Sequence, residues 1–244
     1  MHASWLHRAA QLHITTPDGA PLEHLNERHS PALAQRALHH LELRLRGVPT
    51  LSHLAPEIRA LRLDLKAKHQ AWLEAQDTRV VATSAVRYAD DEQDRAVTRL
   101  SQALLLVLDG DRGAARYRRV FPVPPSEVNI GVGTAAQQEA VAQILEAAKG
   151  EAGIEPLRLN LEAAFGALNA ALADRVAAAR AEASARMDVV LGMEDVVAAY
   201  RRFGARLISD GVEARLVESC FMSLRRAPSD RLDAAGDDGG VEAR

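Results

Sequence analysis

The sequence predicts an all-α fold made of two tandem helical bundles of about four helices each. Helix formers such as Ala, Leu, Arg and Glu dominate three stretches without proline, from Pro56 to Pro122, from Pro125 to Pro156 and from Pro156 to Pro228. Aromatic residues make up only 4% of the 244 residues, and no stretch alternates Val, Ile or Thr with polar residues as strands do. The hydrophobic content of 48% is that of an ordinary globular chain, long enough for one large or two small domains.

The first bundle is expected over residues 30–121, and its first helix from Pro31 to Arg46. Ser30 is a favoured N-cap residue, proline suits the first helical position, and Gly47 suits the end. A long helix over about residues 57–89 follows, because apolar side chains recur near seven-residue spacing. This stripe comprises Ile58, Leu61, Leu65, Trp72, Ala75, Ala82, Val86 and Ala89.

The pair Asp90-Asp91 is expected to break the long helix. A third helix is then predicted over about residues 92–108, ended by Asp109-Gly110. A short fourth helix is predicted over about residues 112–120. The proline-rich segment after it predicts a Pro/Gly linker over residues 122–132.

The second bundle is expected over residues 133–227. Thr134 and Gln137 have capping-box spacing at the start of its first helix, and Gly150 suits the end of that helix. Pro156 then opens a long helix in the role that Pro56 has in the first bundle. Its expected apolar stripe comprises Leu157, Leu161, Phe165, Leu168, Leu172, Val176, Ala179, Ala183 and Val190.

The remaining elements of the second bundle follow the order of the first. Gly192 marks a break, a helix over about residues 194–209 ends in Asp210-Gly211, and a last helix contains Cys220. An offset of 100 residues brings Leu61 to Leu161, and one of 101 brings Asp109-Gly110 to Asp210-Gly211. We therefore predict an internal duplication. The alternative is two unrelated helical segments of similar composition.

The two ends of the chain are expected to lie outside the bundles. Residues 1–29 are poorly periodic and predict an N-terminal arm. Residues 228–244 hold too few apolar side chains to bury and predict a disordered tail.

Histidine is concentrated in the first part of the chain, and this invites a metal site. His24 with Glu27 and His39 with Glu42 stand three residues apart, so each pair shares a helix face. All nine histidines lie at or before His69, and no two of them stand four apart. We therefore expect neither a bound metal nor a cofactor, and solvated or partly buried histidines instead.

Two further motifs suggest phosphate or nucleic-acid binding. Residues 131–136 read GVGTAA, the letters of a dinucleotide fingerprint, but no core strand precedes them, so a linker leading into an N-cap is the better interpretation. Arginines cluster at Arg116, Arg118 and Arg119, at Arg201 and Arg202, and at Arg225 and Arg226. The net charge of −3 and the interspersed acidic residues disfavour nucleic acid as a partner.

No arrangement of residues in the sequence predicts catalysis, so we assign no catalytic residue. Cys220 lies in an apolar stretch far from every histidine and is expected to be a core thiol. The acidic group formed by Asp90, Asp91, Glu92 and Asp94 is expected to form the first turn of a helix, where it complements the helix dipole.

Cysteine usage and hydropathy predict a cytoplasmic protein. A lone cysteine fits a reducing compartment. The N-terminus lacks the pattern of a signal peptide, and the longest apolar run, LLLVL at Leu104–Leu108, is far too short to cross a bilayer.

The function that these features favour is that of a non-enzymatic helical interaction or assembly protein. Its long helices would offer surface to a protein partner or to a second copy of the chain, which makes a homo-oligomer the expected state. The alternative is a ligand-binding or redox helical bundle with an internal cavity. Candidate walls of such a cavity are Trp72, Tyr88, Tyr117, Tyr200 and Phe203.

Overall fold

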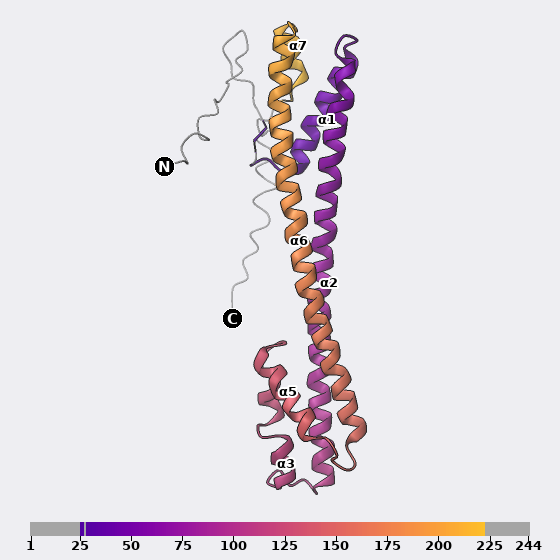
Figure 1. Cartoon of the computed structure of the whole chain (residues 1–244), viewed down its shortest axis with the longest axis vertical. Coiled ribbons are helices and arrows are strands. Elements are labelled where there is room, and N and C mark those ends of the chain that lie inside the picture. Colours follow the sequence, from indigo (N-terminus) through magenta and orange to yellow (C-terminus); the bar gives the residue numbers. More distant parts are fainter. Residues whose placement is uncertain (1–24, 27, 223–244) are drawn as a thin grey trace, which may run out of the picture. The chain divides into compact units, whose positions relative to one another are not determined.

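The computed structural model describes residues 25, 26 and 28–222, and this part of the chain is all-α as predicted (Figure 1). Most of the expected arm and all of the expected tail lie outside the described residues. The elements are α1 (Pro31–Gly47), the 3-10 helix η2 (Ser52–Leu54), α2 (Ala55–Val107), α3 (Ala115–Val120), α4 (Pro125–Val128), α5 (Ala135–Ala147), α6 (Glu155–Ser209) and α7 (Ala214–Cys220).

The predicted helix starts at Ser30 and Thr134 are confirmed. The Ser30 hydroxyl accepts a hydrogen bond from the Leu33 N–H, and the Thr134 hydroxyl accepts one from the Gln137 N–H. Each bond satisfies an N–H group that the helix itself leaves unpaired. The Gln137 side chain also reaches back, and its Oε1 accepts from the Gly133 N–H at 2.8 Å.

The predicted break at Asp90-Asp91 is wrong, because α2 runs unbroken from Ala55 to Val107 over 53 residues. Asp90 is buried, and its Oδ1 accepts a hydrogen bond from Gln137 Nε2 at 3.0 Å. A tertiary partner therefore occupies the carboxylate that would otherwise compete with the helix backbone. It follows that the acidic group does not form a first helical turn either.

The predicted break at Gly192 is also wrong, because α6 runs unbroken over 55 residues. Gly192 is buried at a close approach of the two long helices. A Cβ atom there would lie 3.0 Å from Lys68 Cδ and 3.5 Å from Leu65 Cδ1. The missing side chain permits tight packing, which offsets the low helix propensity of glycine.

The expected linker at residues 122–132 contains a short helix, α4, so it is not wholly irregular. Pro125 occupies its first turn, where a missing N–H costs nothing. Gly131 and Gly133 follow with φ angles of +90° and +59°, and they turn the chain toward the start of α5.

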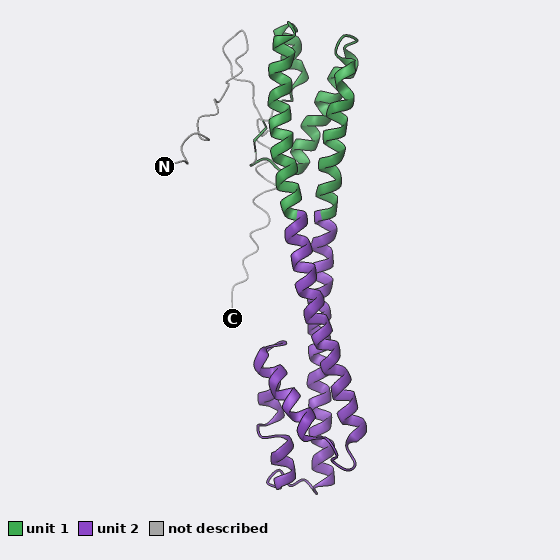
Figure 2. Ribbon diagram, viewed as in Figure 1, with its two compact units in different colours: residues 1–71, 186–244 green, residues 72–185 purple. Residues whose placement is uncertain are grey.

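The structure divides into two compact units, neither of which coincides with an expected bundle (Figure 2). Unit 1 comprises residues 1–71 and 186–244, and unit 2 comprises residues 72–185. Both α2 and α6 cross the boundary, so each unit combines segments from both halves of the sequence. The order of a helix, a very long helix and a short helix does occur twice along the chain. The two units therefore do not support an arrangement of tandem bundles, and the internal duplication stays a prediction.

Unit 2 has a core built where α3 and α5 pack on the long helices. Leu100 and Leu104 of α2 contribute to it together with Leu161 of α6 and Val141 of α5, all with no exposed surface. Glu151, which is buried, pairs with Arg116 and Arg119 of α3. The hydrogen bond from Arg116 is the main reason that the pKa of Glu151 lies below its ordinary value.

Unit 1 is held by a similar combination of apolar packing and a buried carboxylate. Glu42 of α1 is buried and pairs with Arg62 of α2 at 3.0 Å and with Arg46 at 2.5 Å. The Tyr200 and Phe221 rings pack edge to face with centroids 4.9 Å apart. Burial raises the pKa of Tyr200 to about 12, so this phenol is neutral at physiological pH.

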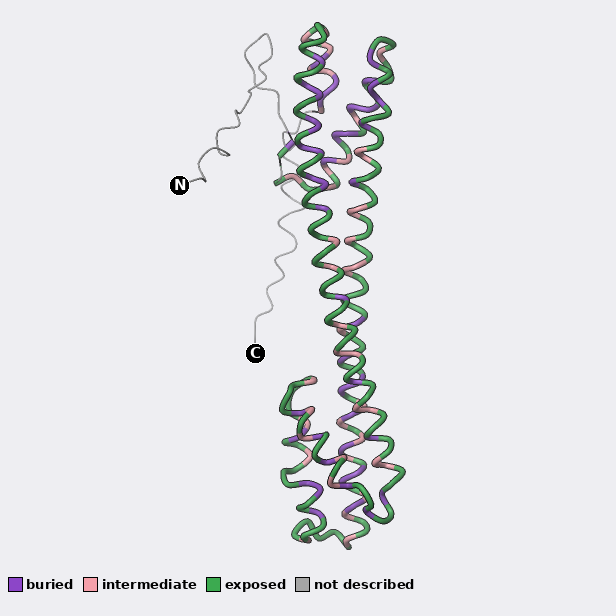
Figure 3. Tube along the Cα trace, viewed as in Figure 1, coloured by how far each residue is buried: buried purple, intermediate pink, exposed green. Residues whose placement is uncertain are grey.

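The two long helices run antiparallel within each unit. In unit 2, Val86 and Ala89 pack against Leu168, and Arg79 Nε lies 2.9 Å from Glu182 Oε2. In unit 1, Leu65 faces Gly192 and Glu57 lies 3.9 Å from Arg206, so residue numbers rise along α2 as they fall along α6. The stripe predicted for the first long helix is confirmed, since none of its eight residues is exposed. Along both long helices, buried and half-buried positions alternate with exposed ones (Figure 3).

The stripe predicted for the second long helix is correct only in its first half. Leu157, Leu161, Phe165, Leu168 and Leu172 are buried or half-buried. The later members, which are exposed, are Val176, Ala179, Ala183 and Val190. In their place Ala178, Ala185 and Val189 turn inward, because the inward face keeps a strict seven-residue repeat while the prediction drifted onto the neighbouring face.

Small side chains form the seam between the two helices in unit 2. Alanine stands at every seventh position on both helices, and none of these residues is exposed: Ala75, Ala82 and Ala89 on α2, and Ala171, Ala178 and Ala185 on α6. Arg79 and Glu182 pair across the same seam. This stretch therefore buries little apolar surface per turn, and polar groups help to set its register.

Candidate interaction surface

The outer face of α2 in unit 2 carries an apolar stripe that has no cover among the described residues. We call Leu73, Val80, Val81 and Tyr88 the outer stripe. Val81 and Tyr88 stand seven residues apart with 68% and 69% of their surface exposed, and Leu73 and Val80 repeat this spacing one position earlier. Large apolar side chains on one exposed helix face are a mark of interaction sites.

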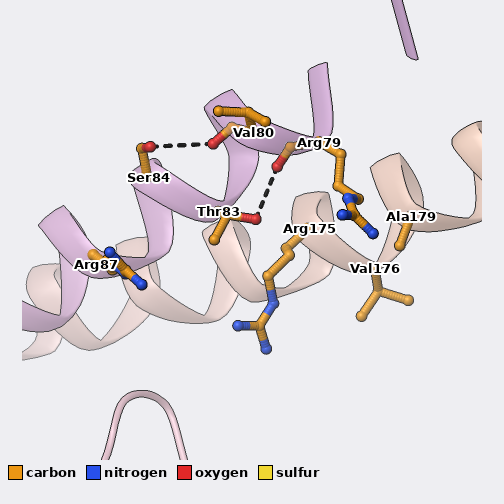
Figure 4. A pocket seen from close by; sticks show the side chains of 8 residues that line it. All are labelled: Arg79, Val80, Thr83, Ser84, Arg87, Arg175, Val176 and Ala179. Carbon is orange, nitrogen blue, oxygen red and sulfur yellow. Dashed lines mark hydrogen bonds between the residues drawn. The ribbon is translucent and has the colours of Figure 1, made fainter. Parts of the chain in front are cut away.

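A groove borders the outer stripe where α2 and α6 lie side by side (Figure 4). We call it the arginine groove. Its volume is about 510 Å3, and both helices contribute side chains to it. The lining residues are Arg79, Val80, Thr83, Ser84 and Arg87 of α2, and Arg175, Val176 and Ala179 of α6.

The charge of the arginine groove comes from its three guanidinium groups, because no carboxylate is among the lining residues. Arg79 pairs with Glu182 beside the groove, whereas Arg87 and Arg175 form no salt bridge within the described part of the chain. The hydroxyls of Thr83 and Ser84 donate to backbone carbonyls of their own helix at 2.8 and 3.1 Å. The groove thus combines apolar side chains with the positive charge of two arginines, Arg87 and Arg175, that form no salt bridge among the described residues.

A second exposed stripe, of opposite charge, lies on α6 in unit 1. We call the exposed side chains of residues 187–195 the acidic stripe; Val189, Gly192 and Met193 of this range face inward and do not belong to it. Met187, Val190 and Leu191 share one helix face and are 56%, 44% and 49% exposed. Asp188, Glu194 and Asp195 are exposed too, and the segment contains no basic residue.

Lys68 of α2 lies beside the acidic stripe. The pKa of Lys68 lies above its ordinary value, chiefly because of its hydrogen bond to Asp64 and further because of the carboxylates of Asp195 and Asp188. The lysine amine lies 2.7 Å from Asp64 Oδ2, so its charge is largely matched within α2. One lysine charge thus faces Asp64 and the carboxylates of Asp188 and Asp195 together.

A polar cluster in unit 2 is the other site with unusual electrostatics. Gln137 Nε2 donates to Asp90 Oδ1 at 3.0 Å and to Asp94 Oδ1 at 3.2 Å. Burial and repulsion by Asp90 raise the pKa of Asp94 to about 6, although the hydrogen bond from Gln137 opposes the shift. The hydrogen bonds of this cluster connect α5 to α2.

The raised pKa of Asp94 predicts a pH-dependent stability. The folded state favours the protonated acid, so the contribution of Asp94 is full below about pH 4 and is lost as the pH rises through about 6. Asp94→Asn should therefore leave the free energy of unfolding unchanged near pH 4 and raise it by about 1 kcal/mol at pH 8, a value reduced for partial solvent exposure. Urea titrations at both pH values measure this change. Asp91→Asn, at an exposed neighbour, is the control, and an equal gain in that variant would contradict the assignment.

The histidine pairs do not form a metal site in the described part of the chain. His39 Nδ1 lies 3.9 Å from Glu42 Oε2, but Arg46 and Arg62 already pair with this carboxylate. His24 and Glu27 lie outside the described residues. Among residues 25, 26 and 28–222, no three His, Cys, Asp or Glu side chains gather as metal ligands would. That the protein binds no metal or cofactor stays a prediction, which elemental analysis of chelator-free protein would test.

The arginine clusters have separate surroundings. Arg116 and Arg119 pair with Glu151, Arg201 and Arg202 are exposed on α6, and Arg225 and Arg226 lie outside the described residues.

The other residues considered as functional candidates, Cys220 and the proposed cavity walls, lie either in the cores or on the surface. Cys220 is buried, and burial raises the pKa of its thiol, as expected for a core cysteine. Of the proposed cavity walls, Tyr200 and Phe203 are buried in unit 1 and Tyr117 in unit 2, whereas Tyr88 is exposed. None of the five aromatic residues lines the arginine groove.

Comparison of the chain with protein-family models, with curated proteins and with solved structures found no match. Within the described residues, no helix combines the length and the hydropathy that a bilayer crossing requires. The class that fold and surface define is therefore an all-α protein with two long antiparallel helices that expose apolar stripes.

Sequence reasoning missed both the outer stripe and the arginine groove. Their signal was present as a second apolar repeat, in which Leu73 and Val80 stand seven apart, each one position after a residue of the seam side of α2, Trp72 and Arg79. The inward and the outward stripe of α2 have the same seven-residue spacing. The outer stripe can therefore be recognised only after the inward face of the helix has been assigned.

Proposed function

We propose that this chain is a non-enzymatic helical interaction or assembly protein that self-associates through its two long helices. The observation that carries the proposal is the outer stripe, which leaves large apolar side chains exposed on a well-formed helix. Burying such side chains in an interface is worth about 25 cal/mol per Å2 of apolar surface, before the costs of association are subtracted.

The small-residue seam supports the same proposal. Because alanine stands at every seventh position of the seam in unit 2, those positions bury little apolar surface, whereas the outer face of α2 has apolar area left to bury. An interface with a second copy of the chain would bury this exposed apolar surface without any change of fold.

The proposal predicts that polar residues in the outer stripe weaken association. Val81→Ser with Tyr88→Ser should raise the dissociation constant of the oligomer about tenfold or more, because two exposed apolar contacts are lost. Sedimentation velocity over a concentration series measures this constant. Leu106→Ser is the matched control, since Leu106 is 82% exposed on the same helix but lies outside the stripe. Equal association by the stripe variant and the control would contradict the proposal.

A further inference from the structure

We propose that the arginine groove of one copy binds the acidic stripe of a second copy. The inference rests on the proposed self-association and names the two surfaces that meet. It commits to a helix-in-groove contact, in which residues 187–195 of α6 lie along the groove that α2 and α6 form in another molecule.

The charges of the two surfaces are complementary. The groove is lined by three arginines and no carboxylate, whereas the acidic stripe holds three carboxylates and no basic residue. Arg87 and Arg175 have no salt-bridge partner in the described part of the chain, and neither have Asp188 and Glu194. Each surface thus offers the groups that the other lacks.

The apolar parts of the two surfaces match as well. Val80 and Val176 form part of the groove lining, one from each helix. Met187, Val190 and Leu191 have the spacing i, i+3 and i+4, with which an amphipathic helix presents one apolar ridge to a groove. Glu194 continues this face one turn further, within reach of arginines at the edge of such a groove.

A contact between two arginine grooves is disfavoured by the same charges. It would bring Arg87 and Arg175 of both copies together with no carboxylate in either lining. The pair of Arg79 with Glu182 shows how a carboxylate on α6 meets a groove arginine, at 2.9 Å. We infer that a carboxylate from the second copy meets Arg87 or Arg175 in the same manner.

Charge reversal tests the pairing directly. One variant carries Arg87→Glu and Arg175→Glu, and Arg79 is left intact because it pairs with Glu182. The other variant carries Asp188→Lys, Glu194→Lys and Asp195→Lys. Each variant alone should associate at least about tenfold more weakly than the unmodified chain, because like charges then meet. An equimolar mixture of the two should associate again, since both groove-to-stripe contacts are once more between opposite charges.

Sedimentation velocity in low salt distinguishes the outcomes, with circular dichroism to verify that each variant is folded. The control for the groove variant is Arg99→Glu with Arg112→Glu, two exposed arginines outside the groove, which changes the net charge by the same amount as the groove variant does. Recovery in the mixture supports the pairing. If the unmodified chain associates but the groove variant matches the control, or the mixture does not recover, this inference is overturned while the proposed function stands. An unmodified chain that stays monomeric overturns both.

Discussion

Replacing Leu168 with alanine should lower the free energy of unfolding by about 3 kcal/mol. Leu168 has no exposed surface and packs between the long helices against Val86 and Ala89, with Ala171 and Leu172 alongside. Removing a buried leucine costs about 2 to 5 kcal/mol, and the cost rises with the cavity that remains. Neighbours as small as alanine cannot fill the space by changing rotamer. Urea denaturation monitored by circular dichroism measures the loss.

Leu159→Ala is the matched control for this variant. Leu159 lies on the same helix, but it is half exposed, so its truncation should change the free energy of unfolding by less than about 0.5 kcal/mol. Both substitutions introduce alanine, so helix propensity contributes equally. Similar losses in the two variants would show that Leu168 does not face the partner helix.

The substitution Gly133→Ala should destabilise the chain by about 2 to 3 kcal/mol. Gly133 has a φ of +59°, which costs a residue with a Cβ atom about 1 kcal/mol or more. The added Cβ would also lie 2.9 Å from Leu172 Cδ2. Moving the backbone to relieve this contact would disturb the hydrogen bond from the Gly133 N–H to Gln137 Oε1.

Gly150→Ala separates the two causes. Gly150 has a φ of +73°, but a Cβ atom there would meet nothing within 4 Å. Its substitution should therefore cost only the conformational part, about 1 kcal/mol. The difference between the two variants in urea denaturation measures the contact with Leu172, and equal costs would contradict this packing.

Helix starts and the first apolar stripe could be predicted from the sequence because they depend on local chemistry. Ser30 and Thr134 cap their helices with their own hydroxyls, and the partners of these hydroxyls stand three residues away. The stripe from Ile58 to Ala89 follows from a seven-residue repeat alone. Neither feature needs knowledge of a distant segment.

The breaks expected at Asp90-Asp91 and Gly192 were wrong because their outcome depends on tertiary contacts. Gln137, 47 residues further along the chain, binds the Asp90 carboxylate, and Leu65 and Lys68 occupy the space beside Gly192. The composition of the two units depends in the same way on the return of α6 along α2. Local propensity carries no information about such partners.

The arginine groove was not predicted because the second half of the apolar stripe of α6 was assigned to the wrong face of the helix. Val176 and Ala179 were expected in the core, and the structure places both in the lining of the arginine groove. Spacings of three and four residues both continue an apolar stripe, and alanine is too small to distinguish an inward from an outward position. The inward face becomes clear only when Ala171, Ala178 and Ala185 are seen to follow one strict repeat.

Light scattering of the unmodified chain over a tenfold dilution tests self-association most directly. We predict a molar mass above the 26.4 kDa of one chain, which falls toward that value as the protein is diluted. A mass of 26.4 kDa at every concentration would contradict self-association and leave the outer stripe without a second copy to cover it.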